Sequence, residues 1–377
     1  MVQILLSWLL VLPSVLCVGF LITNVWGELT KTQERELDIV VMSGLMGLTV
    51  YSQAFSMLYK VGLLANVVLL LIDVVVIIVF HGRIKKGIQH THEIIKRNQY
   101  YVFGIAFIVL LFVAVASAAS GNNVCFDTDL YHAQAIHWIE EYGVVKGEGL
   151  FLRRLAYNSA FFSLQALCSF KWLFGQSLRN VNGLVAFLFL AYDILSFHTI
   201  WKGKVAFSDA LRIVSMLVVY DVSDYKSSST DQFAMLFGVY ILIKWCVYME
   251  EGEVNPHKYA WLCMLAVFAT TIKLSVAGLI ILAIYPIGRL GKERRIKSII
   301  GYIIAGVFIA LPFFARNVII SGWLVYPVSA IDLFNVDWKM TKDVLDGDAL
   351  EISIWGKELV GNPDTEKLIK GLRWVPI

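Results

Sequence analysis

Charged residues are scarce in this chain, and cysteine is rarer still. Asp, Glu, Lys and Arg make up 16% of its 377 residues, whereas 58% are hydrophobic. A soluble domain has about 25% charged residues and cannot bury so much apolar surface, which excludes a soluble enzyme and a disordered chain. The five cysteines form no CxxC pair, so a zinc ribbon or a thioredoxin-like site is excluded. The net charge of +3 gives no basis for nucleic-acid binding.

Long runs of apolar residues make up much of the remaining sequence. They predict an all-α integral membrane protein of about ten transmembrane helices. The first run stays in place as a span, because residues 1–27 lack both charged side chains and the basic start of a signal peptide. The predicted spans are 4–26, 39–56, 61–80, 100–119, 181–199, 207–221, 231–248, 259–272, 274–287 and 298–314.

Clusters of Lys and Arg predict the orientation, because cytoplasmic loops carry an excess of these residues. The loops 81–99 and 288–298 are rich in both and are expected in the cytoplasm. The segment 120–180 then becomes a large first external loop. The next basic loop along the chain is again expected in the cytoplasm, so the chain must cross the membrane an odd number of times between the external segment and that loop. We therefore expect the aromatic and polar segment 155–174 to form interfacial helices that do not cross the membrane.

The same pattern divides the chain into three regions. Residues 1–99 form an N-terminal addition of three spans with a basic cytoplasmic loop. Residues 100–315 form the transmembrane core with the external loop. Residues 316–377 have a soluble composition and form an external C-terminal segment, which can continue in a longer protein.

The densest polar cluster follows the fourth predicted span and contains Asp127, Asp129 and His132. Asp129 is expected to cap a surface helix that Gly143 ends. One carboxylate could deprotonate an acceptor hydroxyl, and the pair could hold a divalent cation, Mg²⁺ or Mn²⁺, that neutralises a phosphate. The alternative is structural: one helix cap and one solvated acid.

Cationic residues on the same predicted side could bind a phosphate. Arg153 and Arg154 can do so with two hydrogen bonds each, and His132 is close enough to Asp129 to take part. Lys273 lies at the tip of a predicted hairpin, and Arg316 follows the last predicted span. Ordinary interfacial arginines and a loop lysine are the alternatives.

Two aspartates, Asp73 and Asp193, fall inside predicted spans. A carboxylate in lipid is costly and is often functional. The pair could line a proton path in a transporter, or each could be satisfied by a neighbouring polar group.

Several stretches resemble a known class of membrane enzymes. A span, an external loop with early acids, an interfacial stretch ending at 172–175 and the outward hairpin at 271–273 resemble the multi-spanning GT-C glycosyltransferases. The stretches 127–143, 154–158 and 316–339 are most similar to a poorly characterised group of bacterial multi-spanning membrane proteins of GT-C type. The resemblance covers roughly residues 100–340.

The resemblance implies transfer of a sugar from a polyprenyl-phosphate donor to an envelope glycan, lipid or protein acceptor. It places the chain in the bacterial cytoplasmic membrane as a multi-pass protein, with membrane lipids as further partners and no nucleic acid. By position, Asp127 or Asp129 matches the catalytic acid of that superfamily, with Arg153, Arg154, Lys273 and Arg316 holding the lipid phosphate. Asp-x-Asp departs from the adjacent acids of the protein-mannosyl branch, so the base and the metal dependence stay open. A transporter or flippase of lipid-linked saccharides is the alternative function, and a polysaccharide polymerase is a third.

Overall fold

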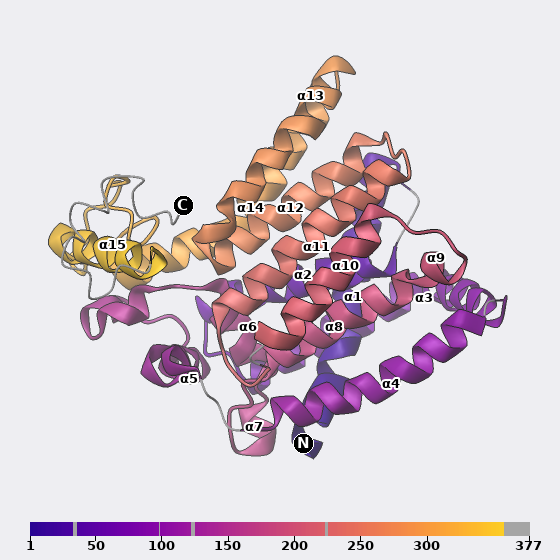
Figure 1. Cartoon of the computed structure of the whole chain (residues 1–377). Coiled ribbons are helices and arrows are strands. Elements are labelled where there is room, and N and C mark those ends of the chain that lie inside the picture. Colours follow the sequence, from indigo (N-terminus) through magenta and orange to yellow (C-terminus); the bar gives the residue numbers. More distant parts are fainter. Residues whose placement is uncertain (33–35, 98, 122–124, 223–224, 358–377) are drawn as a thin grey trace. The chain divides into compact units, whose positions relative to one another are not determined.

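The computed structural model describes residues 1–32, 36–97, 99–121, 125–222 and 225–357 (Figure 1). Regular structure in these ranges is entirely helical, which confirms the all-α prediction. The end of the predicted C-terminal segment, 358–377, lies outside the described residues.

Most of the helices follow one another with short connections, whereas residues 322–341 form a long one between the last two helices. The first half contains α1 (Val2–Thr30), α2 (Leu37–Ser56), α3 (Leu63–Arg97), α4 (Gln99–Ala119), a π-helical turn η1 (Thr128–His132), α5 (Ala133–Tyr142), the 3-10 turns η2 (Glu148–Leu150) and η3 (Arg153–Ala156), α6 (Ala160–Cys168) and α7 (Lys171–Phe174). The second half contains α8 (Val181–Ser196), α9 (His198–Trp201), α10 (Phe207–Val222), α11 (Thr230–Glu250), α12 (Pro256–Ile272), the 3-10 helix η4 (Leu274–Ala283), α13 (Ile284–Lys292), α14 (Ile296–Ser321) and α15 (Lys342–Gly356).

Seven helical segments among the described residues are long and apolar enough to cross a membrane. They are Val2–Thr30, Leu37–Ser56, Leu63–Glu93, Gln99–Ala119, Thr230–Glu250, Leu274–Lys292 and Ile296–Ser321. Each covers one of the ten predicted spans. The other three predicted spans fall on α8, α10 and α12, which have only 16 or 17 residues.

Glycine allows the first two spans to pack closely. A Cβ atom added to Gly19 in α1 would lie 1.9 Å from the carbonyl oxygen of Val40, and one on Gly44 in α2 would lie 1.9 Å from that of Val15. Only a residue without a side chain permits this approach of two backbones, as at many helix contacts in membranes.

The basic segment expected as a cytoplasmic loop is helical instead. α3 continues through residues 81–97, where Arg83 donates hydrogen bonds to Asn24 (3.0 Å) and Glu28 (2.6 Å) of α1. Lys and Arg have helix propensities close to that of Leu, so α3 stays helical although its sequence becomes polar in this segment.

The segment expected at the membrane interface is partly internal. All nine residues of α6 are buried, including the polar Ser163 and Gln165 and the aromatic Phe161 and Phe162. α6 packs against α2 and α5. Its polar residues therefore face protein, and its aromatic rings do not face headgroups as predicted; Trp172 in α7, by contrast, is exposed.

The chain forms two compact units. Unit 1 comprises Met1–Gly143 and Ser159–Pro312, and unit 2 comprises Val144–Asn158 and Phe313–Ile377. The predicted regions 1–99 and 100–315 thus share one unit almost completely, and part of the predicted external loop joins the C-terminal residues. Within unit 1, α11 packs against both α10 and α12, and the three run side by side (Figure 1). The core of unit 2 contains Trp323, Tyr326, Met340 and Leu345.

Candidate functional site

The two candidate catalytic aspartates lie at one tight turn of unit 1. Asp127 directly precedes the π-helical turn η1, and Asp129 lies inside it. The expected capping role of Asp129 is wrong, because His132 occupies the N-cap position of α5 and its side chain makes no capping hydrogen bond. Asp127 is partly exposed and Asp129 is exposed. The helix end at Gly143 is confirmed, with a φ of 76°.

A hydrogen-bond network fixes this turn to the starts of α8 and α11. The backbone N–H of Ser228 donates to Thr128 Oγ1 over 3.2 Å. Asn182 in α8 donates to the carbonyl oxygens of Ser227 (3.0 Å) and Ser229 (2.8 Å). Ser229 in turn caps α11. Because Thr128 and Asn182 are both buried, the acid turn has a rigid support.

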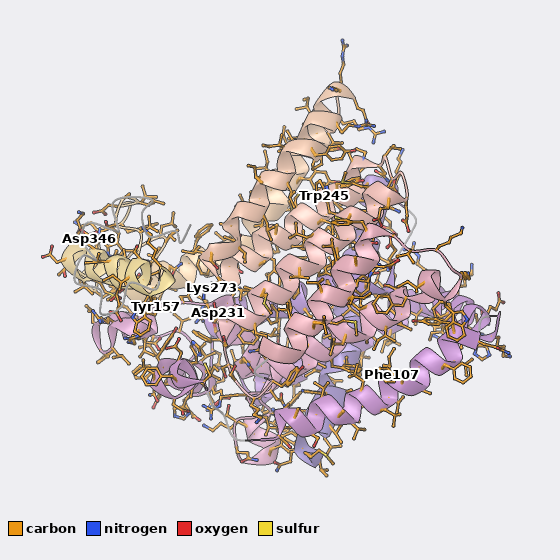
Figure 2. The ribbon with its side chains drawn as sticks, in the orientation of Figure 1. Phe107, Tyr157, Asp231, Trp245, Lys273 and Asp346 are labelled. Carbon is orange, nitrogen blue, oxygen red and sulfur yellow. The ribbon has the colours of Figure 1, made fainter. Side chains whose placement is uncertain are left out.

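Lys273 stands where α12 ends and η4 begins. A hydrogen bond from Ser159 to the carbonyl oxygen of the preceding Ile272 (2.8 Å) anchors this chain reversal. The Lys273 ammonium forms an ion pair with Asp231 in the first turn of α11, and the two side chains lie next to each other (Figure 2). Burial lowers the pKa of Lys273, while the negative charge of Asp127 acts to raise it. The structure therefore brings two predicted site residues, Asp127 and Lys273, into one electrostatic neighbourhood.

Asp231 belongs to this cluster although it was not among the candidate site residues predicted from the sequence. It opens a predicted span, where an acid is common because it interacts favourably with the helix dipole. No local signal pairs it with a lysine one helical hairpin away.

A groove of about 450 Å³ opens at the Lys273–Asp231 pair. Most of its surface is apolar, and hydroxyl, amide and charged groups lie among the apolar side chains. The buried Oε1 atom of Gln232 has no hydrogen-bond partner among the described residues. The groove is lined by Ser229, Asp231, Gln232, Ala234, Met235, Lys273, Ser275 and Val276.

His132 is buried beside this cluster. Only 3% of it is exposed, and its ring packs against Tyr131 (4.3 Å between ring centroids) and Phe162 (5.1 Å). Burial and the nearby charge of Lys273 lower the pKa of His132 to about 3. The imidazole is therefore neutral at physiological pH, so it can contribute a hydrogen bond to a phosphate but no positive charge.

The candidate arginines at 153 and 154 belong to unit 2 and contact acids of α15. Arg153 lies 3.1 Å from Asp348 and 2.7 Å from Glu351, and Arg154 lies 2.9 Å from Glu351. Asp348 is fully buried and also accepts a hydrogen bond from Tyr326. These contacts join η3 to α15, so both arginines have a structural role within unit 2.

Arg316 is also a residue of unit 2 and is buried in it. It donates to Asn158 Oδ1 over 3.0 Å, and Asn158 donates to the carbonyl oxygen of Phe313 over 3.1 Å. Burial raises the pKa of the nearby Glu148 to about 7, although the positive charge of Arg316 acts in the opposite direction. Arg316 thus has polar partners inside the protein.

The two aspartates inside predicted spans have neighbours of their own. Asp73 accepts a hydrogen bond of 2.5 Å from Ser14 in α1. Asp193 in α8 lies 3.8 Å from the guanidinium of Arg212, and Ser215 donates to it over 3.5 Å. Such partners reduce the cost of a buried carboxylate.

A metal ion at the candidate site would need ligands besides the protein's own side chains. Within the described residues, no group of three or more His, Cys, Asp or Glu side chains could hold an ion. Asp127 and Asp129 supply two carboxylates, which is the number that Mg²⁺ sites often combine with substrate phosphate oxygens and water.

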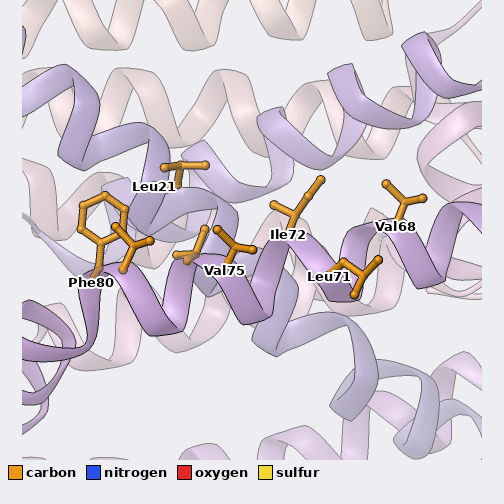
Figure 3. A pocket seen from close by; sticks show the side chains of 8 residues that line it. Leu21, Val68, Leu71, Ile72, Val75 and Phe80 are labelled. Carbon is orange, nitrogen blue, oxygen red and sulfur yellow. The ribbon is translucent and has the colours of Figure 1, made fainter.

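A second groove lies on the apolar surface between α1 and α3 (Figure 3). Its volume is about 440 Å³, and it offers no polar side chain for chemistry. The lining residues are Leu21, Val68, Leu71, Ile72, Val75, Val76, Val79 and Phe80.

Comparison with known proteins finds one family. The model of a family described as "Domain of unknown function (DUF8201)" matches residues 1–376. No curated protein and no solved structure matches the chain.

Proposed function

We propose that this chain, which belongs to the DUF8201 family, is a membrane glycosyltransferase that uses a polyprenyl-phosphate sugar as donor. The observation that carries the proposal is the Lys273–Asp231 pair, which lines a mainly apolar groove within electrostatic reach of Asp127. The acceptor is a hydroxyl of an envelope glycan, lipid or protein.

The groove has the character that such a donor requires. A lipid-linked sugar joins a hydrocarbon chain, a phosphate and a hydroxyl-rich ring in one molecule. Lys273 suits the phosphate, Ser229, Gln232 and Ser275 suit hydroxyl groups, and Met235 and Val276 offer apolar contact. Asp231 is largely exposed, and an exposed ion pair contributes little to stability, so the singly charged phosphodiester of the donor can replace Asp231 beside Lys273.

The proposed reaction is a displacement at the anomeric carbon. Asp127 accepts the proton of the acceptor hydroxyl as its oxygen forms a bond to that carbon. The bond between the carbon and the phosphate oxygen breaks, and its electron pair leaves with polyprenyl phosphate. The Lys273 ammonium stabilises the negative charge that develops there.

The neighbouring residues take supporting parts. Asp129 orients Asp127, or both hold a divalent cation that neutralises phosphate charge when bound. His132 donates or accepts a hydrogen bond as a neutral ring. In this proposal Arg153, Arg154 and Arg316 keep the polar contacts that each makes within unit 2, and the phosphate in the groove of unit 1 is assigned to Lys273.

The proposal includes a topology. We propose ten spans, with α8, α10 and α12 as short crossings inside the bundle, and residues 120–180 on the outer face of a bacterial cytoplasmic membrane. Ionic residues at the other end of α11 support this arrangement. There the buried Lys244 lies 2.8 Å from Asp38, and Lys258 lies 2.7 Å from Glu253, so long basic side chains near this helix end are paired with acids.

Binding of polyprenyl phosphate tests the proposal without knowledge of the sugar, because every donor of this class releases it. The purified protein in nanodiscs is titrated with radiolabelled C55 polyprenyl phosphate. Lys273→Gln should weaken binding roughly 10- to 100-fold, the value of a hydrogen bond to a charged group. Lys171→Gln is the matched control, because Lys171 also pairs with a carboxylate of unit 1, Glu141, but lies outside the groove. Equal affinity in the wild type and Lys273→Gln would contradict the proposal.

The transfer step is tested in membranes that carry the native donors. Asp127→Asn should abolish glycan transfer and leave binding of polyprenyl phosphate intact, because it removes only the base. A transporter or flippase predicts the reverse: Asp73→Asn and Asp193→Asn would stop lipid movement across the bilayer, and Asp127→Asn would not. The partners found for Asp73 and Asp193 favour a structural role for both.

A further inference from the structure

Two loops of unit 2 carry large apolar side chains on their surface. In the first loop, 59% of Leu150 and 73% of Phe151 are exposed. In the second, 67% of Leu333 is exposed. Side chains of this size are unfavourable in water, and a group of them marks a contact surface.

The first loop is held against the last turn of α14. The backbone N–H of Gly147 donates to the carbonyl oxygen of Ile319 over 2.9 Å. A Cβ atom on Gly149 would lie 2.5 Å from the sulfur of Met340 and 3.4 Å from the carbonyl oxygen of Ile320. The backbone is therefore pressed against the helix end, and Leu150 and Phe151 have no room on that side and point outward.

The second loop is tied to the same helix end. Trp338 Nε1 donates to the carbonyl oxygen of Val318 over 3.0 Å, and the N–H of Met340 donates to that of Ser321, also over 3.0 Å. Between them, Lys339 donates to the carbonyl oxygen of Phe334 over 2.7 Å. Leu333 directly precedes Phe334, so this hydrogen bond connects it to Lys339, whose two neighbours in the chain are both bonded to the helix end.

The position of the end of α14 indicates the environment of these side chains. Ile296–Ser321 is a candidate membrane span, and Val318 to Ser321 form its final turn. Groups held beside that turn lie at the level where the span leaves the hydrocarbon. We propose that Leu150, Phe151 and Leu333 insert into the interfacial layer of the lipid bilayer and anchor unit 2 to it.

Charge near the first loop agrees with a lipid partner. Lys146, whose ammonium lies 3.8 Å from the centroid of the Trp338 ring, is exposed. Basic residues beside an apolar wedge are typical of segments that lie in the interface, where phosphate headgroups attract them.

Site-directed spin labelling in vesicles of phosphatidylcholine and phosphatidylglycerol tests the anchor. Nitroxides are placed in the full chain through Phe151→Cys and Leu333→Cys, with Asp343→Cys in α15 as the exposed polar control. Cys17, Cys125 and Cys246 are replaced by alanine; Cys168 and Cys263 are buried and do not react. The ratio of oxygen to nickel-chelate accessibility should be higher at 151 and 333 than at 343.

A water-like ratio at 151, equal to that at 343, would overturn the proposal. An apolar photolabel dissolved in the vesicles provides a second measurement on the chain without substitutions. Peptides that contain residues 147–152 should be labelled, whereas peptides of 342–346 should not. Absence of label from the first peptide would also overturn it. Neither readout requires glycosyl transfer, so the anchor can fail while the proposed function stands.

Discussion

The buried imidazole of His132 should make the protein sensitive to mild acid. In the unfolded chain the pKa of a histidine is near 6.5, whereas burial and Lys273 lower it to about 3 in the folded protein. Between these values the unfolded state binds a proton that the folded state rejects. The stabilising contribution is therefore complete above about pH 6.5 and is lost as the pH falls toward 3.

The size of the effect follows from the two pKa values. Between pH 7.5 and pH 5, His132 should lower the free energy of unfolding by about 2 kcal/mol. Because only 3% of His132 is exposed, solvent screens little of this. The assay is unfolding by SDS of the protein in detergent, followed by tryptophan fluorescence at both pH values.

Two variants isolate the residue. His132→Phe keeps an aromatic ring between Tyr131 and Phe162 but cannot bind a proton, so its stability should change by about 2 kcal/mol less between the two pH values than that of the wild type. His137→Gln, at an exposed position of α5, should keep the wild-type dependence. The same pH dependence in His132→Phe as in the wild type would refute the reasoning, whatever the absolute stabilities.

Three further changes have defined outcomes. Asp231→Asn frees Lys273 from its counter-ion and should strengthen binding of polyprenyl phosphate; weaker binding in the nanodisc titration would contradict displacement of Asp231 by phosphate. In the wild type the pKa of Glu148 is raised to about 7 in the folded protein, so its protonated side chain favours the folded state at low pH and ceases to do so above pH 7. Glu148→Gln should therefore remove the loss of stability that accompanies rising pH. SDS unfolding at pH 5 and pH 8 measures this difference. Gly143→Ala should destabilise the protein by roughly 1–3 kcal/mol, since its φ is 76° and a Cβ would lie 2.5 Å from the carbonyl oxygen of Ser56; a thermal unfolding midpoint equal to that of the wild type would exclude the strain.

Part of the candidate site could be predicted because it is local. Asp127, Asp129 and His132 are neighbours in sequence, and a cluster of polar residues directly after an apolar run is visible without a structure. Lys273 was visible for a similar reason, as a single charge between two apolar segments. Its pairing with Asp231 was not, because only the packing of α11 against α12 and η4 brings them together.

The sequence by itself determined that this is a helical membrane protein, where most of its spans lie, and that Gly143 ends a helix. These properties depend on hydropathy and backbone preference over one or two turns, which neighbouring residues supply. Only the tertiary structure decided which residues the charged and polar side chains contact. Arg153 contacts Glu351, 198 residues away, α6 turns its serine and glutamine toward protein, and the basic end of α3 stays helical against α1. Electrostatic pairing depends on distance in space, and composition does not encode which helices meet.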